Sequence, residues 1–208
     1  MDGTGGTPWP VEAIVLAAGQ SRRMGRQNKL LLDCGNRCLL EVVVERLVTL
    51  PFREVLVVLG NDARQFKSLL ASYPVRIVEN PQYRQGIATS IRAGVREAPE
   101  DVRGYLFYLA DMPFVRPQTL RRLCRAFLNH PTSRIVIPTY NRQRGNPVIV
   151  PRELKTALLE LKGDVGARQL LQRYSGNLLE LPVDDPGIHR DIDTEADVRR
   201  WLKDSLSS

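Results

Sequence analysis

A turn of very small residues followed by several cations is the first feature of this sequence that could do chemistry. Residues 17–19 read Ala-Ala-Gly, so the backbone N–H groups of the turn can lie directly against a ligand, and Gly19 can adopt a positive φ at little cost. A row of such amides forms a concavity that attracts anions. The sequence then adds a hydroxyl at Ser21 and positive charges that include those of Arg22, Arg23 and Lys29. The combination predicts a polyphosphate-binding loop.

This loop matches neither of two common phosphate-binding motifs. Both the G-x-x-x-x-G-K-[ST] spacing and the G-x-G-x-x-G spacing are absent from it. The ordinary alternative is a strand followed by a glycine turn, with the arginines solvated on the surface. The residues between Gly19 and Asn28 have no apolar face of helical period, however, so burial in the core does not explain their order. We therefore interpret them as ligand-binding.

Asp111 is the second candidate, because a carboxylate at its position could hold a metal ion. It follows residues 105–109, the most apolar segment of the chain, which predicts a buried strand. Ligands of open α/β sheets gather outside the carboxyl ends of strands. An aspartate at such a place is also often only a turn residue or a helix cap, and this alternative stays open.

Two hydroxyls form a third candidate at the start of a predicted helix. Thr89 and Ser90 follow Gly86 and fall in the first helical turn, whose backbone amides lack partners within the helix. These hydroxyls could bind a ribose or a base. They could equally cap the helix.

Apolar patterning places these candidates at the ends of alternating strands and helices. Strands are predicted over residues 11–16, 54–59, 75–78, 105–109, 135–137, 148–150 and, at an edge, 178–183. Helices are predicted over residues 39–50 and 63–72, from the segment 85–94 onward, over residues 116–129 and 151–161, near 168–171 and after a cap at Asp193 or Thr194.

Length and composition favour one domain in a reducing compartment. The 208 residues suffice for one sizeable α/β domain but not for two comfortable ones, and the hydrophobic content of 43% supports a full core. No apolar run approaches the length of a membrane span. The three cysteines form no even framework, and no apolar signal segment precedes residue 11, so we expect a cytoplasmic protein. Residues 1–10 are small and polar, and we expect them to be loosely ordered before a single domain over 11–208.

The net charge of +7 raises the possibility of a nucleic-acid partner. The basic residues are spread along the chain, without the aromatic interleaving that base stacking requires. We therefore expect anionic small molecules as partners, and neither nucleic acid nor a membrane.

Five motifs, in order along residues 11–202, resemble those of the MobA-like NTP transferase family. They are L-A-A-G-x-S-x-R-M-G-x-x-N-K-L-L from Leu16, N-P-x-x-x-x-G-x-x-x-S-I-x-x-G from Asn80, D-M-P from Asp111, G-D-x-G-A-R from Gly163 and D-I-D-T-x-x-D from Asp191. Within the family, the chain looks most like the molybdenum cofactor cytidylyltransferases, because L-A-A-G is typical of CTP users and L-A-G-G of GTP users.

The resemblance implies a fold and a reaction. The fold is a single-domain, Rossmann-like three-layer α/β/α structure with a mostly parallel sheet, like that of nucleotide-diphospho-sugar transferases. The reaction is Mg²⁺-dependent transfer of CMP from CTP to a phosphorylated acceptor, molybdopterin or Mo-molybdopterin, with release of pyrophosphate. Alternatives are GTP as donor, a sugar or isoprenoid phosphate as acceptor, or a non-catalytic protein that delivers a nucleotide or pterin. A molybdoenzyme or its chaperone could be the protein partner.

The resemblance also assigns roles to residues. Arg23 would clamp the polyphosphate, Lys29 would lie near the α-phosphate, and Asp111 and Asp191 would hold Mg²⁺, with Arg23, Lys29 and Asp111 as the catalytic set. The nucleotide-binding residues would be Leu16, Ala17, Ala18, Gly19, Ser21, Arg22, Arg23, Lys29, Asn80, Gly86 and Ser90. The acceptor-binding residues would be Gly145, Asn146, Pro147, Asp164 and Arg168. Asn146 stands where the family usually has histidine, which leaves the identity of the acceptor open.

Overall fold

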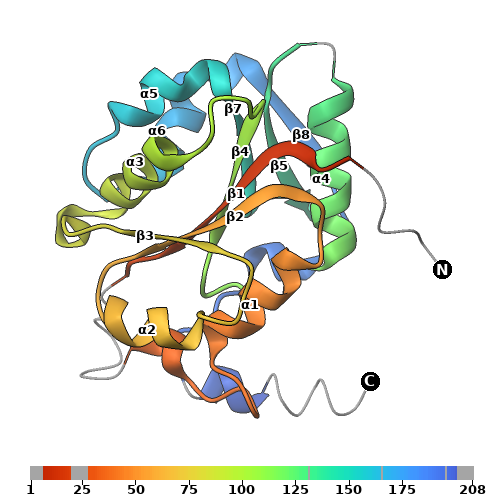
Figure 1. Cartoon of the computed structure of the whole chain (residues 1–208). Coiled ribbons are helices and arrows are strands. Elements are labelled where there is room, and N and C mark those ends of the chain that lie inside the picture. Colours follow the sequence, from red (N-terminus) through yellow and green to blue (C-terminus); the bar gives the residue numbers. More distant parts are fainter. Residues whose placement is uncertain (1–6, 20–27, 131, 165, 195, 201–208) are drawn as a thin grey trace.

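A mixed β-sheet with helices on both faces forms the protein (Figure 1), as a computed structural model shows. The structure describes residues 7–19, 28–130, 132–164, 166–194 and 196–200. Its strands are β1 (Trp9–Ala17), β2 (Phe52–Leu59), β3 (Arg76–Glu79), β4 (Gly104–Leu109), β5 (Ile135–Tyr140), β6 (Gln143–Arg144), β7 (Val148–Pro151) and β8 (Leu178–Pro182). Its helices are α1 (Leu39–Val48), α2 (Ala63–Leu69), α3 (Ile87–Glu97), α4 (Pro117–Asn129), α5 (Lys155–Leu159) and α6 (Gly166–Arg173). The predicted fold class, a three-layer α/β/α domain, is confirmed.

The sheet is parallel where it carries the candidate residues. The strand order is β3-β2-β1-β4-β7-β5-β6, with β8 paired to β5, and β3, β2, β1 and β4 all run in the same direction. Leu16 of β1 lies opposite Leu109 of β4. The glycine turn after β1 and Asp111 after β4 therefore leave the sheet side by side, at the edge where ligands of parallel sheets bind.

Two apolar layers sandwich this sheet. On one face the buried side chains of α1 and α4 pack on the strands, and on the other face those of α3 and α5 do so. The central strands β1, β2 and β4 are buried over most of their length because both faces are covered. This explains why they read as continuous apolar runs in the sequence.

Several element boundaries differ from the predicted ones. Residues 151–161 do not form one helix: Pro151 ends β7 opposite Gly104, a 3₁₀ turn follows over Arg152–Leu154, and only Lys155–Leu159 is α-helical. The antiparallel pairing of β7 with β4 takes precedence over the ability of proline to begin a helix. At the start of the chain, β1 begins at Trp9, because its ring packs edge to face on Phe52 with 5.3 Å between ring centroids.

Two further expectations concern the ends of the chain. Thr194 caps the helix that begins by residue 196: its hydroxyl accepts from Asp197 N at 3.2 Å, and Asp197 Oδ2 accepts from Thr194 N at 2.8 Å. Of the segment expected to be loosely ordered, residues 1–6 lie outside the described residues. Among the helices that the structure describes, none is long and apolar enough to cross a membrane.

A carboxyl group is buried in the amino-terminal half of β1, while the glycine turn follows the carboxyl end of the same strand. Glu12 of β1 is 0% exposed. If its carboxyl group were ionised, neither oxygen would accept a hydrogen bond from a described residue. Burial, reinforced by the neighbouring carboxylate of Glu54, raises the pKa of Glu12 to about 8, although Arg76 and Arg53 oppose the shift. Glu12 is therefore largely protonated at neutral pH, and its proton can be donated to Glu54.

This burial predicts a pH-dependent stability. Because the native pKa of Glu12 lies above its ordinary value of 4.5, the native state holds a proton that the unfolded chain has already lost. The free energy of unfolding should fall as the pH rises from about 5 to about 8, by on the order of 1 kcal/mol per pH unit from this group. Glu12→Gln should remove most of this slope in urea unfolding measured across that range, and Glu160→Gln, at an exposed carboxyl, should keep it. An unchanged slope in Glu12→Gln would contradict the assignment.

Candidate active site

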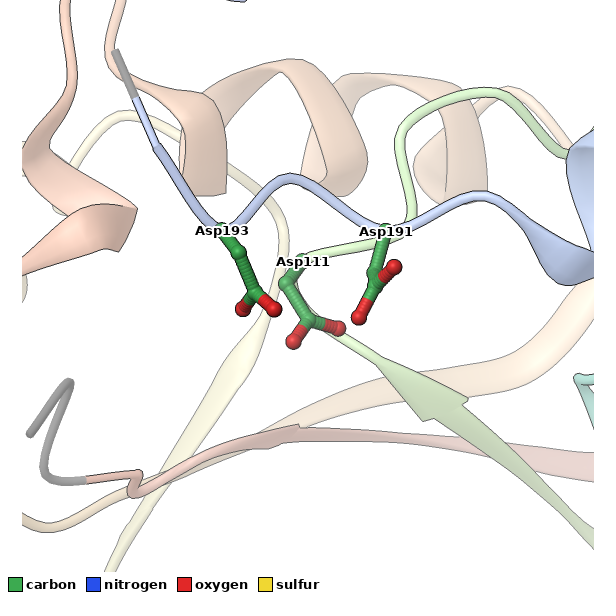
Figure 2. Close-up of side chains that lie close together, drawn as sticks. All are labelled: Asp111, Asp191 and Asp193. Atoms are coloured by element: carbon green, nitrogen blue, oxygen red, sulfur yellow. The ribbon is translucent and has the colours of Figure 1, made fainter. Parts of the chain in front are cut away.

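Three carboxylates meet beyond the carboxyl end of β4 (Figure 2). Asp111 comes from the turn after β4, while Asp191 and Asp193 come from the extended segment that precedes the last helix. One oxygen of each lies within 4.8 Å of one oxygen of each of the others. Ile192 N donates to the carbonyl oxygen of Asp111 at 2.8 Å and so ties the two segments together. The structure thus brings together Asp111 and Asp191, which are 80 positions apart in the chain.

Asp193 is a member of this cluster that the sequence reasoning missed, because it was interpreted as a helix cap. The cap is Thr194, and the Asp193 carboxylate accepts from Lys29 Nζ at 2.7 Å. The signal was present in the sequence: in an extended segment, residues two apart project to the same side, so Asp-Ile-Asp presents both carboxylates together.

Lys29 links the glycine loop to the carboxylates. Its Nζ lies 2.7 Å from Asp111 Oδ2 and 2.7 Å from Asp193 Oδ1. Burial lowers the pKa of Lys29, but Asp111 and Asp193 outweigh it, so the pKa lies above its ordinary value. The lysine is therefore fully charged at neutral pH and acts as a counter-ion to the cluster.

The donor set fits a hard divalent cation. Asp111 Oδ1 is buried and accepts no hydrogen bond from the residues that the structure describes. Carboxylate oxygens are the protein ligands that Mg²⁺ and Mn²⁺ favour, and one or two of them with substrate phosphates commonly complete a Mg²⁺ site. Asp111, Asp191 and Asp193 are the residues that could hold such an ion.

The glycine loop is only partly described. The strand β1 ends with Leu16 and Ala17, and Ala18 and Gly19 come directly after it. A Cβ on Gly19 would meet nothing within 4 Å. Ala18 is 5% exposed, and a Cβ on Gly60 would lie 2.9 Å from its Cβ, so Gly60 must stay without a side chain for the turn to pack here. The predicted phosphate-binding residues Ser21, Arg22 and Arg23 lie outside the described residues.

Asn80 and Ser90, both predicted to bind the nucleotide, form a buried network. Asn80 Nδ2 donates to Thr89 Oγ1 at 2.7 Å and to Ser90 Oγ at 3.0 Å, and all three residues are 4% exposed. Thr89 Oγ1 also donates to Gly86 O at 2.8 Å. These bonds anchor the first turn of α3 to the end of β3, but none of them satisfies a backbone N–H of the helix, so they do not bear out the helix-capping alternative. Nucleotide binding by Asn80 and Ser90 stays a prediction.

Gly86 and Asp164 form a second junction at the start of α3. Asp164 Oδ1 accepts from Ile87 N at 3.1 Å, and Gly163 O accepts from Ala88 N at 3.1 Å. Gly86 has φ +105°, and a Cβ there would lie 2.5 Å from the carbonyl carbon of Gly163. Only glycine allows this close approach, and the Asp164 carboxylate caps the helix.

A pocket of about 450 Å³ lies beside these groups. It is lined by Leu16, Ile87, Ile91, Phe107, Leu109, Ile137, Arg144, Gly145, Asn146, Val148, Asp164, Leu171 and Gln172. Three residues predicted to bind the acceptor, Gly145, Asn146 and Asp164, are among them. Pro147 follows them through a cis peptide bond, and Arg168 lies on α6, in a stretch whose side chains are outside the described part of the structure.

The pocket adds polar residues that the sequence reasoning missed. Arg144 of β6 pairs with Glu180 of β8, with 2.8 Å from Nε and 2.5 Å from Nη2 to the same carboxylate oxygen. Gln172 of α6 supplies an amide. No sequence signal marked either residue, because their approach depends on β6 pairing with β5 and on the placement of α6. The pocket therefore combines polar groups with apolar residues of the strands and of α3 and α6, close to the turns that carry Gly19 and Asp111.

The chain matches known proteins over most of its length. A model of the MobA-like NTP transferase domain matches residues 13–178. The chain is 29% identical over 201 residues to nicotine blue oxidoreductase of Paenarthrobacter nicotinovorans, covering 92% of this chain and 96% of that protein. It is 25% identical over 189 residues to molybdenum cofactor cytidylyltransferase of Escherichia coli, covering 90% and 93%.

Solved structures agree with this match. Rv0371c from Mycobacterium tuberculosis is 28% identical, with a TM-score of 0.81 over 95% of this chain and 100% of that one. A structure of Rv0371c in complex with manganese, 26% identical, has a TM-score of 0.76 over the same shares of the two chains. A 4-diphosphocytidyl-2C-methyl-D-erythritol synthase from Anaerococcus prevotii, 16% identical with a TM-score of 0.74 over 97% of each chain, shares the fold. The predicted likeness to nucleotide-diphospho-sugar transferases is thus confirmed at the level of the fold.

The hydrogen bond from Ile87 N to Asp164 at the start of α3 gives a prediction about the stability of the protein. Asp164→Ala removes the acceptor for Ile87 N and should lower the free energy of unfolding by about 1 kcal/mol. Asp164→Asn keeps a capping oxygen and should cost only a few tenths of that. Urea unfolding of both variants checks the difference. Equal losses in the two variants would show that the carboxylate does not act as a cap.

Proposed function

The chain belongs to the MobA-like NTP transferase family of nucleotidyltransferases, and we propose that it transfers CMP from CTP to a phosphorylated pterin, molybdopterin or Mo-molybdopterin, with release of pyrophosphate. One observation carries this proposal: Asp111, Asp191, Asp193 and Lys29 converge beside the glycine turn after β1, next to a pocket large enough for a second substrate. A triphosphate and an acceptor could meet there.

The reaction needs alignment more than acid–base chemistry. An oxygen of the acceptor phosphate attacks the α-phosphorus, and the bond from that phosphorus to the bridging oxygen breaks, so pyrophosphate leaves with the electron pair. The acceptor is already an anion, and no general base is required. Asp111, Asp191 and Asp193 would hold Mg²⁺, which when bound neutralises negative charge on the phosphates. Lys29 and Arg23 would supply further positive charge.

The lining of the pocket supports a ring-shaped acceptor. The lining combines aliphatic side chains and one aromatic ring, including Ile91, Phe107 and Val148, with Asn146, Gln172 and Arg144, which offer hydrogen bonds. A flat heterocycle with polar edges, such as a pterin, suits a lining that mixes apolar side chains with a few hydrogen-bonding groups. A sugar phosphate, which carries hydroxyls on every side, would leave much of its surface without hydrogen-bond partners.

Cytidine rests on the resemblance of the L-A-A-G turn to that of CTP users and on the similarity to a molybdenum cofactor cytidylyltransferase. GTP as donor and a sugar or isoprenoid phosphate as acceptor are the enzymatic rivals. A non-catalytic carrier of nucleotide or pterin is another, with delivery to a molybdoenzyme or its chaperone in the cytoplasm. The similarity to nicotine blue oxidoreductase over 92% of the chain adds a fourth rival, an oxidoreductase that acts on a compound such as nicotine blue.

One set of incubations separates these functions. The protein is mixed with Mg²⁺ and each nucleoside triphosphate in turn, with Mo-molybdopterin or with a sugar or isoprenoid phosphate as acceptor, and pyrophosphate is measured. We expect release with CTP. Release with GTP alone would refute the assignment of the base, and release with CTP only when a sugar or isoprenoid phosphate replaces the pterin would refute the acceptor. Tight CTP binding without pyrophosphate would favour a carrier. Redox turnover of nicotine blue, in a separate incubation without pterin or triphosphate, would favour the oxidoreductase.

Asp111 gives the sharpest variant for the reaction. Asp111→Asn keeps the shape of the side chain but removes its charge, and it should lower Mg²⁺-dependent pyrophosphate release by at least about 10²-fold. Asp101→Asn is the matched control, because Asp101 is 63% exposed and pairs with Arg53 near the amino end of β4. A fully active Asp111→Asn enzyme would remove Asp111 from the metal site.

A further inference from the structure

Lys29 occupies two carboxylate oxygens of the cluster that could hold a metal ion, one of Asp111 and one of Asp193. Its ammonium lies 2.7 Å from Asp111 Oδ2 and from Asp193 Oδ1, and both carboxylates belong to the cluster that could bind a divalent cation. An ammonium and a divalent cation that share these ligands would lie only a few ångströms apart and repel each other strongly. The two cations therefore cannot both keep full contact with the same oxygens.

We propose that Lys29 and the divalent cation exchange: binding of the metal displaces the Lys29 ammonium from Asp111 and Asp193 and frees it for the triphosphate. The proposal rests on the metal site of the proposed function, and it adds an order to the events in that site. Counted over these four side chains, the three carboxylates and one ammonium carry a net charge of −2, and replacing the ammonium by one divalent cation reduces this charge to −1.

Hydrogen bonds fix the backbone around Lys29, while its side chain can change rotamer. The neighbouring Asn28 is 3% exposed: its Oδ1 accepts from Leu30 N at 3.1 Å, and its Nδ2 donates to Asp62 Oδ2 at 3.1 Å. Residues Lys29–Leu31 form a 3₁₀ turn on this anchor. The Lys29 side chain itself is 18% exposed. A four-carbon stem on a fixed backbone lets the ammonium move several ångströms without unfolding the turn.

A lysine suits this exchange better than an arginine would. The ammonium is a compact point charge with three donors on a flexible stem, so it can leave two carboxylates for another anion without a fixed geometry. A guanidinium would bind a carboxylate in a bidentate manner and would resist displacement. The side-chain type at position 29 therefore bears on metal affinity as well as on phosphate binding.

The first test follows the ammonium directly. The full-length protein is labelled with trace acetic anhydride, without nucleotide, with and without saturating Mg²⁺, and the rate at each lysine is read by mass spectrometry. We expect Mg²⁺ to raise the rate at Lys29 severalfold, because its ion pairs with Asp111 and Asp193 break. Lys67 and Lys155, which pair with Glu79 and Glu100 away from the site, are internal controls and should not change. An unchanged or lower rate at Lys29, with Mg²⁺ bound, would overturn the proposal.

The second test measures competition for the carboxylates. Lys29→Met keeps most of the stem but removes the charge, so Mn²⁺ titrated without nucleotide and followed by electron paramagnetic resonance should bind about tenfold more tightly than to the wild type. Lys67→Met is the matched control and should bind as the wild type does. Lys29→Gln, a second uncharged variant, guards against a folding defect of the first. Equal or weaker Mn²⁺ binding in both folded variants would contradict the exchange.

These measurements are independent of turnover. If they come out as expected while the protein releases no pyrophosphate with any triphosphate, the exchange stands and the proposed reaction fails. If pyrophosphate is released from CTP but Lys29 stays protected in the presence of Mg²⁺, the reaction stands and the exchange is wrong.

Discussion

Mutual repulsion among three carboxylates is the constraint on which this site depends. Asp111, Asp191 and Asp193 each place an oxygen within 4.8 Å of the others, which is unfavourable unless positive charge lies between them. Lys29 supplies part of that charge, and its raised pKa is the reciprocal effect of the same attraction. A protein that keeps like charges this close forgoes stability there, and such sites are commonly functional. Glu12, in the amino-terminal half of β1, avoids repulsion from Glu54 in a different way, because its raised pKa lets it keep a proton.

The fold imposes this closeness through a few backbone contacts. Leu16 opposite Leu109 sets the glycine turn beside Asp111, and the bond from Ile192 N to Asp111 O brings in the late segment of the chain. Residues of α3 and α6 then line the pocket that lies beside the three carboxylates. A donor substrate over the turn and an acceptor in the pocket would thus approach a common point without any large movement of the sheet.

The sequence was informative wherever local pattern and structure share a cause. Strands buried on both faces read as apolar runs, and the aspartate after residues 105–109 was found because ligands gather at strand ends. Boundaries failed where tertiary pairing decided them, as at Pro151, which joined β7. Asp193 was missed because a local capping interpretation sufficed, while its contact with Lys29 spans 164 positions. Arg144 and Gln172 carry no local signal, because only the assembled sheet and helices bring them to the pocket.

The central claim is that these carboxylates hold the divalent cation that positions a triphosphate. A crystal of the protein with Mn²⁺ and a non-hydrolysable CTP analogue, examined by anomalous diffraction at the manganese edge, tests it most directly. The account predicts one strong peak about 2.2 Å from an oxygen of Asp111 and from an oxygen of Asp191 or Asp193, in contact with the phosphates. A peak elsewhere, with the analogue bound and the three aspartates unligated, would contradict it.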